Sequence, residues 1–271
     1  MTTGIDIISR FEQFASPQLA EKWDHPGLQL GNPNLEVKKL MTTLDVRPEV
    51  VTEAIEEHVD FIFAHHPVMF RPAKDLDLRN PQNKMYAQLL ESGITVYAAH
   101  TNLDTANGGM NDWLADQLGL VDTEPLIDAG KDPVSGEKIG MGRVGNIDRD
   151  FTAEQFAKYC QETFNVPNLR WAAPTNNRLI HRIAILGGSG QDFWQAALKK
   201  GADAYVTGDT TYHFVQDMIS NGLTLIDPGH HIEAVCETKL AELFNNWKED
   251  YNWNIEIVQN SINTDPFNFR S

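Results

Sequence analysis

Apolar strand patterns alternate with amphipathic helix patterns along most of this chain of 271 residues. Short apolar runs such as KLMTT and FIFA are followed by polar turns, and the turns are followed by helix patterns of about ten to fifteen residues. This alternation is typical of βαβ units, in which helices connect parallel strands and pack on the sheet. The sequence therefore predicts an α/β fold with mainly parallel sheets.

The second half of the chain repeats the pattern of the first. The segments that start LMTTLDV and IAILGGS both run strand, turn, helix, aspartate, strand and polar turn, with Asp60 placed on Asp203. A second match, of SGITVYAAHTNLD with NGLTLIDPGHHIE, places Asp104 on Glu233. The alternative is a chance similarity between unrelated βαβ units. A true repeat predicts two similar α/β lobes, related by a pseudo-twofold axis, that face each other across a cleft. Each lobe would then deliver a carboxylate from the carboxyl end of an equivalent strand.

Residues 121–150 depart from this alternation. PLIDAGKDPVSGEKIGMGRVGNI is rich in glycine and turn residues, which predicts a loop followed by a hairpin-like or edge strand. We place the lobe boundary here, with residues 1–125 as the N-terminal lobe and residues 126–271 as the C-terminal lobe of one compact unit. The C-terminal segment is expected to pack on the N-terminal lobe. Thr152 and Gln155 form a capping box that predicts the start of the next helix.

Charge and cysteine content restrict the compartment and the partners. The formal net charge of −16 argues against nucleic acid or an anionic membrane as the main partner. Cys160 and Cys236 lie far apart and form no CxxC pair, which fits buried thiols in a reducing compartment. The first residues lack the long apolar run of a signal peptide or a membrane span. We therefore expect a soluble cytoplasmic protein whose partners are neither membranes nor nucleic acid.

Histidines and acidic residues gather at the ends of three strand patterns. His65 and His66 follow FIFA, Asp104 ends the turn HTNLD, and His230 and Glu233 follow the strand LTLID. Divalent transition metals need neutral imidazoles and ionised carboxylates that converge from separate segments. Adjacent residues of an extended strand project to opposite sides, so the two adjacent histidines could serve two different metals. The alternative for any single histidine is a buried or surface residue without a ligand role.

Three motifs resemble the GTP cyclohydrolase 1 type 2 homologue family, also called Nif-three-like proteins. They are HHP, AAHTNLDTANGGMNDWLA and GDTTYHFVQDMISNGLTLIDPGHHIEAV. The segment WDHPGLQLGNP is also similar, although relatives more often have Asn where His25 stands. The likeness extends from about residue 4 to about residue 262. Many relatives carry an additional domain between the two halves, and this chain resembles the short form without it.

The resemblance implies a dinuclear centre with two divalent metal ions per chain, for which Zn, Mn, Fe, Co and Ni all suit a mixed nitrogen and oxygen site. By position it makes His65 and Asp104 ligands of one metal and His66 and His230 ligands of the other. Glu233 would bridge the two metals.

Three further histidines leave alternatives open. Some relatives place the final His and Glu four residues apart instead of three, so His231 is an alternative ligand to His230, which we favour. His100 is expected to orient a metal ligand without binding the metal itself. It is also the one candidate for a catalytic role. His213, in TTYHF, either points into the cleft or is an ordinary helix residue.

The activity that the resemblance implies is metal-dependent hydrolysis of a small, nucleotide-like molecule by a homohexamer. Two metals about 3.5–4 Å apart would lower the pKa of a shared water. Opening of the GTP purine ring rests on the family label alone. One alternative is a non-catalytic metal-binding hexameric scaffold. Another is a metal-dependent phosphodiesterase or nuclease, which a basic groove near the cleft would favour.

Two weaker features have structural interpretations. GGSG at residues 187–190 lies between a strand and a helix, as a phosphate-cradling turn would. Because the segment lacks a Walker lysine and a dinucleotide fingerprint, we favour a plain βα turn. The tryptophans are expected in the core or at an interface: Trp23, Trp113, Trp171 and Trp194.

Overall fold

The computed structural model describes residues 1–132, 136–174 and 178–270. The chain divides into two compact units. Unit 1 comprises Met1–Leu103 and Ala234–Thr264, and unit 2 comprises Asp104–Glu233 and Asp265–Ser271. Among the helices of the described residues, none combines the length and hydrophobicity that a bilayer crossing requires.

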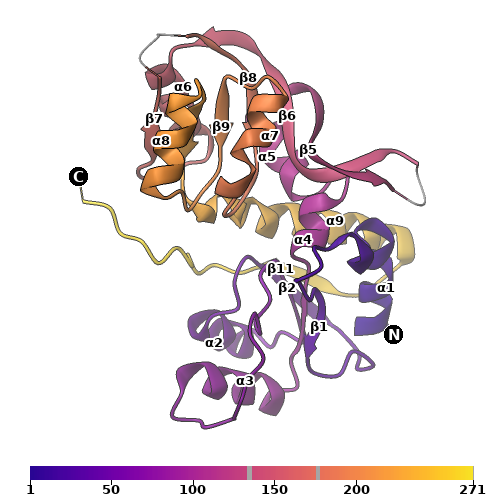
Figure 1. Ribbon diagram of the computed structural model, residues 1–271. Coiled ribbons are helices and arrows are strands. Elements are labelled where there is room, and N and C mark those ends of the chain that lie inside the picture. Colours follow the sequence, from indigo (N-terminus) through magenta and orange to yellow (C-terminus); the bar gives the residue numbers. More distant parts are fainter. Residues whose placement is uncertain (133–135, 175–177, 271) are drawn as a thin grey trace. The chain divides into compact units, whose positions relative to one another are not determined.

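Unit 1 is built on a five-stranded sheet with the order β1-β4-β3-β2-β11 (Figure 1). Four strands are parallel, and β1 pairs antiparallel with β4 at one edge. Helices cover both faces of the sheet, which is why its strands are apolar on both sides. The strands are β1 (Gly27–Leu30), β2 (Lys39–Thr43), β3 (Phe61–Ala64), β4 (Thr95–Ala98) and β11 (Glu256–Gln259). The helical segments are α1 (Gly4–Phe14), η1 (Pro17–Leu19), α2 (Pro48–Glu56), α3 (Pro81–Glu91) and α9 (Val235–Tyr251).

Two different cores lie on the two faces of this sheet. Helices α2 and α3 pack aliphatic side chains such as Val50 and Leu89 against one face. On the other face, α1 and α9 contribute aromatic rings, and Phe63 lies 4.6 Å from Phe11 and 4.8 Å from Phe244 between ring centroids. The sheet is therefore held between two apolar layers, and its strand ends are fixed in place.

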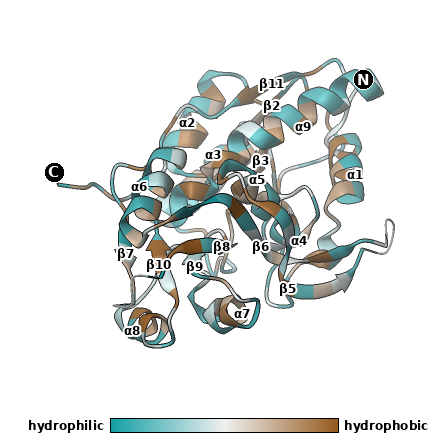
Figure 2. Cartoon of the chain, turned by 90° about the horizontal axis from the view of Figure 1, so that it is seen from above, coloured by the Kyte–Doolittle hydropathy of each residue, from teal (hydrophilic) through white to brown (hydrophobic). Residues whose placement is uncertain are grey.

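Unit 2 contains a six-stranded sheet with the order β5-β6-β8-β9-β10-β7. Strands β8, β9 and β10 are parallel, and the other pairings are antiparallel. The central strands are strongly hydrophobic, whereas the helices carry hydrophilic residues among the hydrophobic ones (Figure 2). The strands are β5 (Val121–Lys131), β6 (Lys138–Phe151), β7 (Arg170–Ala172), β8 (Ile180–Ile185), β9 (Ala204–Val206) and β10 (Thr224–Asp227). The helical segments are α5 (Met110–Gln117), α6 (Ala153–Thr163), η2 (Gln191–Phe193), α7 (Trp194–Lys199), α8 (Tyr212–Ser220) and η3 (His230–Ala234), while α4 (Thr101–Thr105) contains the change between the units.

The topology and matching hydrogen bonds are consistent with the predicted internal repeat. Each sheet has three successive parallel strands and an antiparallel edge strand on the third. Asp60 Oδ2 accepts hydrogen bonds from two consecutive backbone N–H groups near the start of β2, at 2.7 and 2.9 Å. Asp203 Oδ2 does the same near the start of β8, at 3.0 and 2.9 Å. The carbonyls of Asp60 and Asp203 accept hydrogen bonds from Thr95 and Thr224, each at 3.0 Å.

Residues 121–131 form strand β5 where the sequence predicted a loop, and the predicted edge strand is confirmed, while residues 133–135 of the predicted loop lie outside the described residues. Strands β5 and β6 form a long antiparallel pair, and β5 lies at the edge of the sheet. The glycines of β6 provide close backbone approach rather than a loop. A Cβ atom at Gly140 would lie 1.9 Å from the carbonyl oxygen of Ile127.

The units change at residues 103 and 104, whereas the sequence placed the boundary at residues 125 and 126. Residues 104–125 belong to unit 2 because α5 packs on β6 and β8, and because β5 pairs with β6. The chain returns to unit 1 near its C-terminal end, where β11 pairs with β2.

Both cysteines are buried thiols, and the capping box of α6 is present.

We predict that the two equivalent aspartates stabilise their units to a similar extent. Asp60→Ala and Asp203→Ala should each lower the free energy of unfolding by about 1–3 kcal/mol, because each removes charge-assisted bonds to two backbone amides. Urea denaturation measures this loss, with the exposed Asp116→Ala as the control within about 0.5 kcal/mol of wild type. Losses no larger than that of the control would show that these hydrogen bonds do not define the repeat.

Candidate metal centre

In unit 1 the two adjacent histidines continue an extended strand. His65 N–H donates to the carbonyl of Thr43 at 3.1 Å and His66 N–H donates to the carbonyl of Leu44 at 3.0 Å, so the pairing with the β2 segment runs past the end of β3. In an extended backbone the two side chains leave in different directions. His65 is fully buried and His66 is partly exposed.

Hydrogen bonds at Nδ1 fix the orientation of both rings. His65 Nδ1 lies 2.7 Å from the carbonyl oxygen of Ala99, and His66 Nδ1 lies 2.7 Å from Asp45 Oδ1. A carbonyl oxygen can only accept, so His65 Nδ1 carries the proton. A carboxylate selects the same tautomer in His66. In each neutral ring the lone pair is then on Nε2, which is the arrangement found in metal-bound histidines.

His100 lies with these two residues. One ring nitrogen from each of His65, His66 and His100 lies within 4.8 Å of the others, a spacing that could hold a metal ion. His100 Nδ1 contacts Asp24 Oδ1 at 3.0 Å. Burial of Asp24 opposes its ionisation, but hydrogen bonds from His100 and Thr101 outweigh burial and hold the pKa of its carboxyl well below the usual range. Asp24 is therefore an ionised anchor for the His100 ring.

In unit 2 a short helical segment brings a histidine and a glutamate together. The segment η3 begins at His230, directly after β10, and its turn places His230 Nε2 3.1 Å from Glu233 Oε2. This confirms that the i, i+3 spacing puts both on one face. His230 Nδ1 lies 2.8 Å from Asp209 Oδ2, so both ring nitrogens face carboxylate oxygens, one of them on the buried Glu233.

Asp104 joins this group in unit 2. It is 9% exposed, and one of its carboxylate oxygens lies within 4.8 Å of one of Glu233. The buried Asn111 fixes the surroundings, since its Nδ2 donates to the carbonyl of Asp104 at 3.0 Å while its Oδ1 accepts from Gly187 N–H at 3.0 Å. Unit 2 thus presents two carboxylates and one imidazole as candidate ligands.

The GGSG turn makes room for these side chains. A Cβ atom at Gly187 would lie 2.8 Å from Glu233 Oε1. At Gly188, whose φ of +62° already favours glycine, it would lie 2.9 Å from Glu233 Oε1 and 3.2 Å from His230 Nε2. The turn precedes only a three-residue helical segment, η2. Gly187 and Gly188 are explained by their contact with the candidate ligands, whereas Gly190 packs against Thr207 and Tyr205.

Several anchoring residues could not be recognised from sequence spacing. Asp45, Asp209 and Asp24 hold the Nδ1 atoms of His66, His230 and His100, respectively. The one signal in the sequence was the position of Asp45 and Asp209 directly after apolar strands.

A role as metal ligand has less support for His213 and His231. His213 is an exposed residue of α8 whose Nδ1 contacts Gln216 at 3.3 Å, so it is placed as an ordinary helix residue. The contact of His230 with Glu233 supports His230 over His231 as the ligand.

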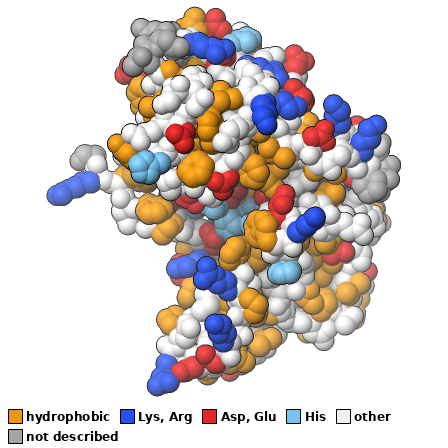
Figure 3. Space-filling view, in the orientation of Figure 1, with side chains coloured by type: hydrophobic (Ala, Val, Ile, Leu, Met, Phe, Trp, Pro, Cys, Tyr) orange, Lys and Arg blue, Asp and Glu red, His pale blue; other side chains and the backbone are white. Residues whose placement is uncertain are grey.

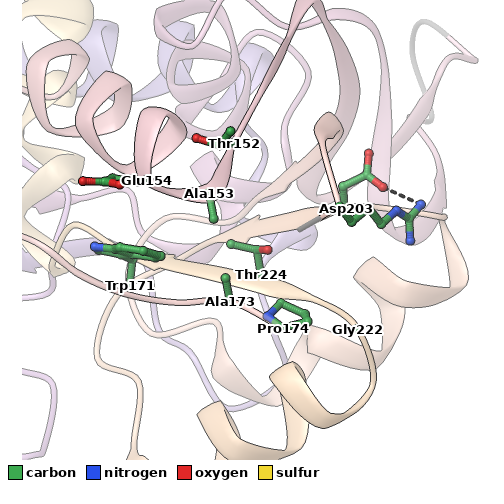
Figure 4. A pocket seen from close by; sticks show the side chains of 10 residues that line it. Thr152, Ala153, Glu154, Trp171, Ala173, Pro174, Asp203, Gly222 and Thr224 are labelled. Carbon is green, nitrogen blue, oxygen red and sulfur yellow. Dashed lines mark ion pairs between the residues drawn. The ribbon is translucent and has the colours of Figure 1, made fainter. Parts of the chain in front are cut away.

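A large pocket of unit 2 is separate from the candidate ligands. It has a volume of about 530 Å³ and is lined by Trp171 and by the ion pair of Arg178 with Asp203, at 2.5 Å (Figure 4). Asp203 and Thr224, which also line it, stand at the amino ends of β9 and β10. Ligands of parallel sheets bind at the carboxyl ends, where the candidate metal ligands follow their strands.

Basic side chains do not gather on the face shown in Figure 3. There the Lys and Arg side chains lie in separate groups, with Asp and Glu between them.

Comparison with known proteins gives consistent matches over the whole chain. The Duf34/NIF3 (NGG1p interacting factor 3) family profile matches residues 2–266. A GTP cyclohydrolase 1 type 2 homolog from Streptococcus pneumoniae is 41% identical over 265 residues, with 97% of each chain covered. A relative of the same name from Halalkalibacterium halodurans is 27% identical over 370 residues, with 99% of each covered. Because that alignment is longer than this chain, the relative contains residues that this chain lacks, as expected for a short form. The structure of a Bacillus cereus protein related to NIF3 matches with a TM-score of 0.94 and 28% identity, covering 99% of both chains.

We predict that Gly188→Ala disturbs Glu233 in addition to straining the backbone. The left-handed backbone alone costs about 1–2 kcal/mol for alanine, and the displaced side chain adds about 1–3 kcal/mol. Gly201→Ala is the matched control, since Gly201 has a φ of +76° and no atom within 4 Å of its Cβ position. Denaturant unfolding of both variants measures the difference. Equal losses of stability would mean that the glycine does not make room for Glu233.

Proposed function

We propose that this chain, which belongs to the Duf34/NIF3 (NGG1p interacting factor 3) family, is a dinuclear metal-dependent hydrolase of a nucleotide-like substrate. Its metal ligands would be His65, His66, Asp104, His230 and Glu233. When bound, two divalent ions lower the pKa of a shared water toward neutrality and neutralise charge on a substrate oxygen.

The observation that carries the proposal is the set of Nδ1 contacts. His65, His66 and His230 each have Nδ1 held by an oxygen atom, at 2.7, 2.7 and 2.8 Å. The contacts of His65 and His66 favour the tautomer whose Nε2 lone pair is available to a metal, and His230 Nε2 faces Glu233. Such outer contacts are typical of metal-ligating histidines, in which they set both ring orientation and basicity.

The division of the ligands is the one that the family resemblance implies. His65 and Asp104 are assigned to one metal, His66 and His230 to the other, and Glu233 to both. The adjacent histidines diverge, which favours two centres over one. The proximity of the Asp104 and Glu233 carboxylates supports a shared anionic position. A mixed nitrogen and oxygen donor set suits Zn, Mn, Fe, Co or Ni.

Within this site, His100 is the residue best placed to move a proton. Its Nδ1 is held by the ionised Asp24, so its Nε2 can accept a proton from water or deliver one to a leaving group. Its position beside His65 and His66 supports this role. We also propose, from the family resemblance, that the chain acts as a cytoplasmic homohexamer.

Turnover tests the hydrolase directly. Protein loaded with Mn²⁺ or Zn²⁺ should hydrolyse at least one member of a panel of nucleotides and phosphodiesters, and Glu233→Ala should lower the rate at least about 100-fold by removing the bridging ligand. Glu242→Ala, an exposed residue of α9, is the control and should keep the wild-type rate. If the loaded protein holds two metals and turns over no substrate of the panel, the non-catalytic scaffold is the correct description.

A further inference from the structure

Two large aromatic side chains of unit 1 lie on the surface. Trp23 is 56% exposed and Phe70 is 62% exposed, and their ring centroids are 6.0 Å apart. By contrast, Trp113, Trp194 and Trp247 are each at most 7% exposed. Of the two positions expected for Trp23, the core is therefore excluded, and an interface stays a prediction. An exposed indole leaves a large apolar area in water, so its position calls for a ligand or partner.

Both rings lie against His100. The centroid of Trp23 is 5.8 Å from that of His100 with an interplanar angle of 76°, and the centroid of Phe70 is 6.5 Å away with an angle of 80°. His100 in turn lies 5.4 Å from His65 and 5.7 Å from His66 between ring centroids. A flat molecule on the aromatic pair would thus have its other end beside the candidate metal ligands of unit 1.

The turn that carries Trp23 is firmly held. Its neighbour Asp24 is buried and accepts hydrogen bonds from the amide and hydroxyl of Thr101, at 3.0 and 2.5 Å. Glu21 N–H donates to the Thr101 hydroxyl at 2.9 Å, on the other side of the tryptophan. The ring is therefore presented in advance, which lowers the entropy lost when a ligand binds.

Positive charges flank the pair although the chain is strongly acidic overall. Lys22 precedes Trp23, Arg71 follows Phe70, and Lys74 lies three residues further on; all three are exposed. The nearby Asp77 is paired with Arg79, with Nη2 and Oδ2 2.6 Å apart. Glu21 and Asp75, which are also exposed, stand beside Lys22 and Lys74, so the charges around the pair are mixed.

We propose that Trp23 and Phe70 bind the planar ring of a heteroaromatic substrate, such as the base of a nucleotide, whose reacting group lies toward His100 and the metal ligands. The inference rests on the proposed function and adds to it the residues that recognise the ring. Stacking on an aromatic side chain is sequence-tolerant because every base has a π-face. The pair would therefore select for a ring rather than for one particular base.

Equilibrium binding to the metal-loaded, full-length protein tests this proposal. The probes are guanosine monophosphate, adenosine monophosphate and inorganic phosphate, measured by calorimetry on Trp23→Leu, Phe70→Leu and wild type. Trp171→Leu is the matched control, because Trp171 is also exposed, at 45%, but lies in unit 2. We expect Trp23→Leu to bind both nucleotides about ten-fold more weakly or worse, Trp23→Tyr to recover most of the affinity, and phosphate binding to stay unchanged.

Three results would overturn the proposal. The first is equal nucleotide affinity in wild type, Trp23→Leu and Trp171→Leu. The second is a change of oligomeric mass in Trp23→Leu by light scattering, which would make the aromatic pair a contact between copies of the chain. The third is binding of a single-stranded oligonucleotide far more tightly than of a mononucleotide. If no turnover is found but nucleotide binding still depends on Trp23, the result counts against the proposed hydrolase alone. Failure of the hydrolase proposal can therefore be told apart from failure of the aromatic binding site.

Discussion

Parallel strand pairing is the constraint on which the candidate site depends. When neighbouring strands run in the same direction, the residues that follow them meet at one edge of the sheet. In unit 1 this edge collects His65 and His66 after β3 and His100 after β4. In unit 2 the same edge collects Asp209 after β9 and His230 after β10. The pairing is fixed at the opposite ends by Asp60 and Asp203, which hold backbone amides at the strand starts.

Two carboxylates of the candidate site are buried, where a negative charge is costly in free energy. Glu233 is 3% exposed and Asp104 is 9% exposed, and their carboxylates are close together. Like charges in a buried setting repel, and each loses hydration. The proposed metal would relieve both effects and would account for the donor set and the burial together.

Much of this could be predicted from the sequence because the signals are local. Strand and helix periodicity gave the α/β class, and the matched positions of Asp60 and Asp203 gave the repeat. The long β5–β6 pair was missed because glycines that allow close backbone approach look the same in sequence as loop glycines. Asp45 and Asp24 were missed because each acts on a histidine that is distant in the chain. The exposure of Trp23 depends on a long-range bond between Asp24 and Thr101 that no spacing reveals.

The central claim is that the adjacent histidines serve two different metal ions. Anomalous diffraction from crystals soaked in Mn²⁺ or Zn²⁺ tests it most directly, with wild type, His65→Ala and His66→Ala treated alike. The account predicts two anomalous peaks per chain in wild type, one surviving peak in each variant, and different surviving peaks in the two variants. A single peak in wild type, or the same surviving peak in both variants, would contradict it.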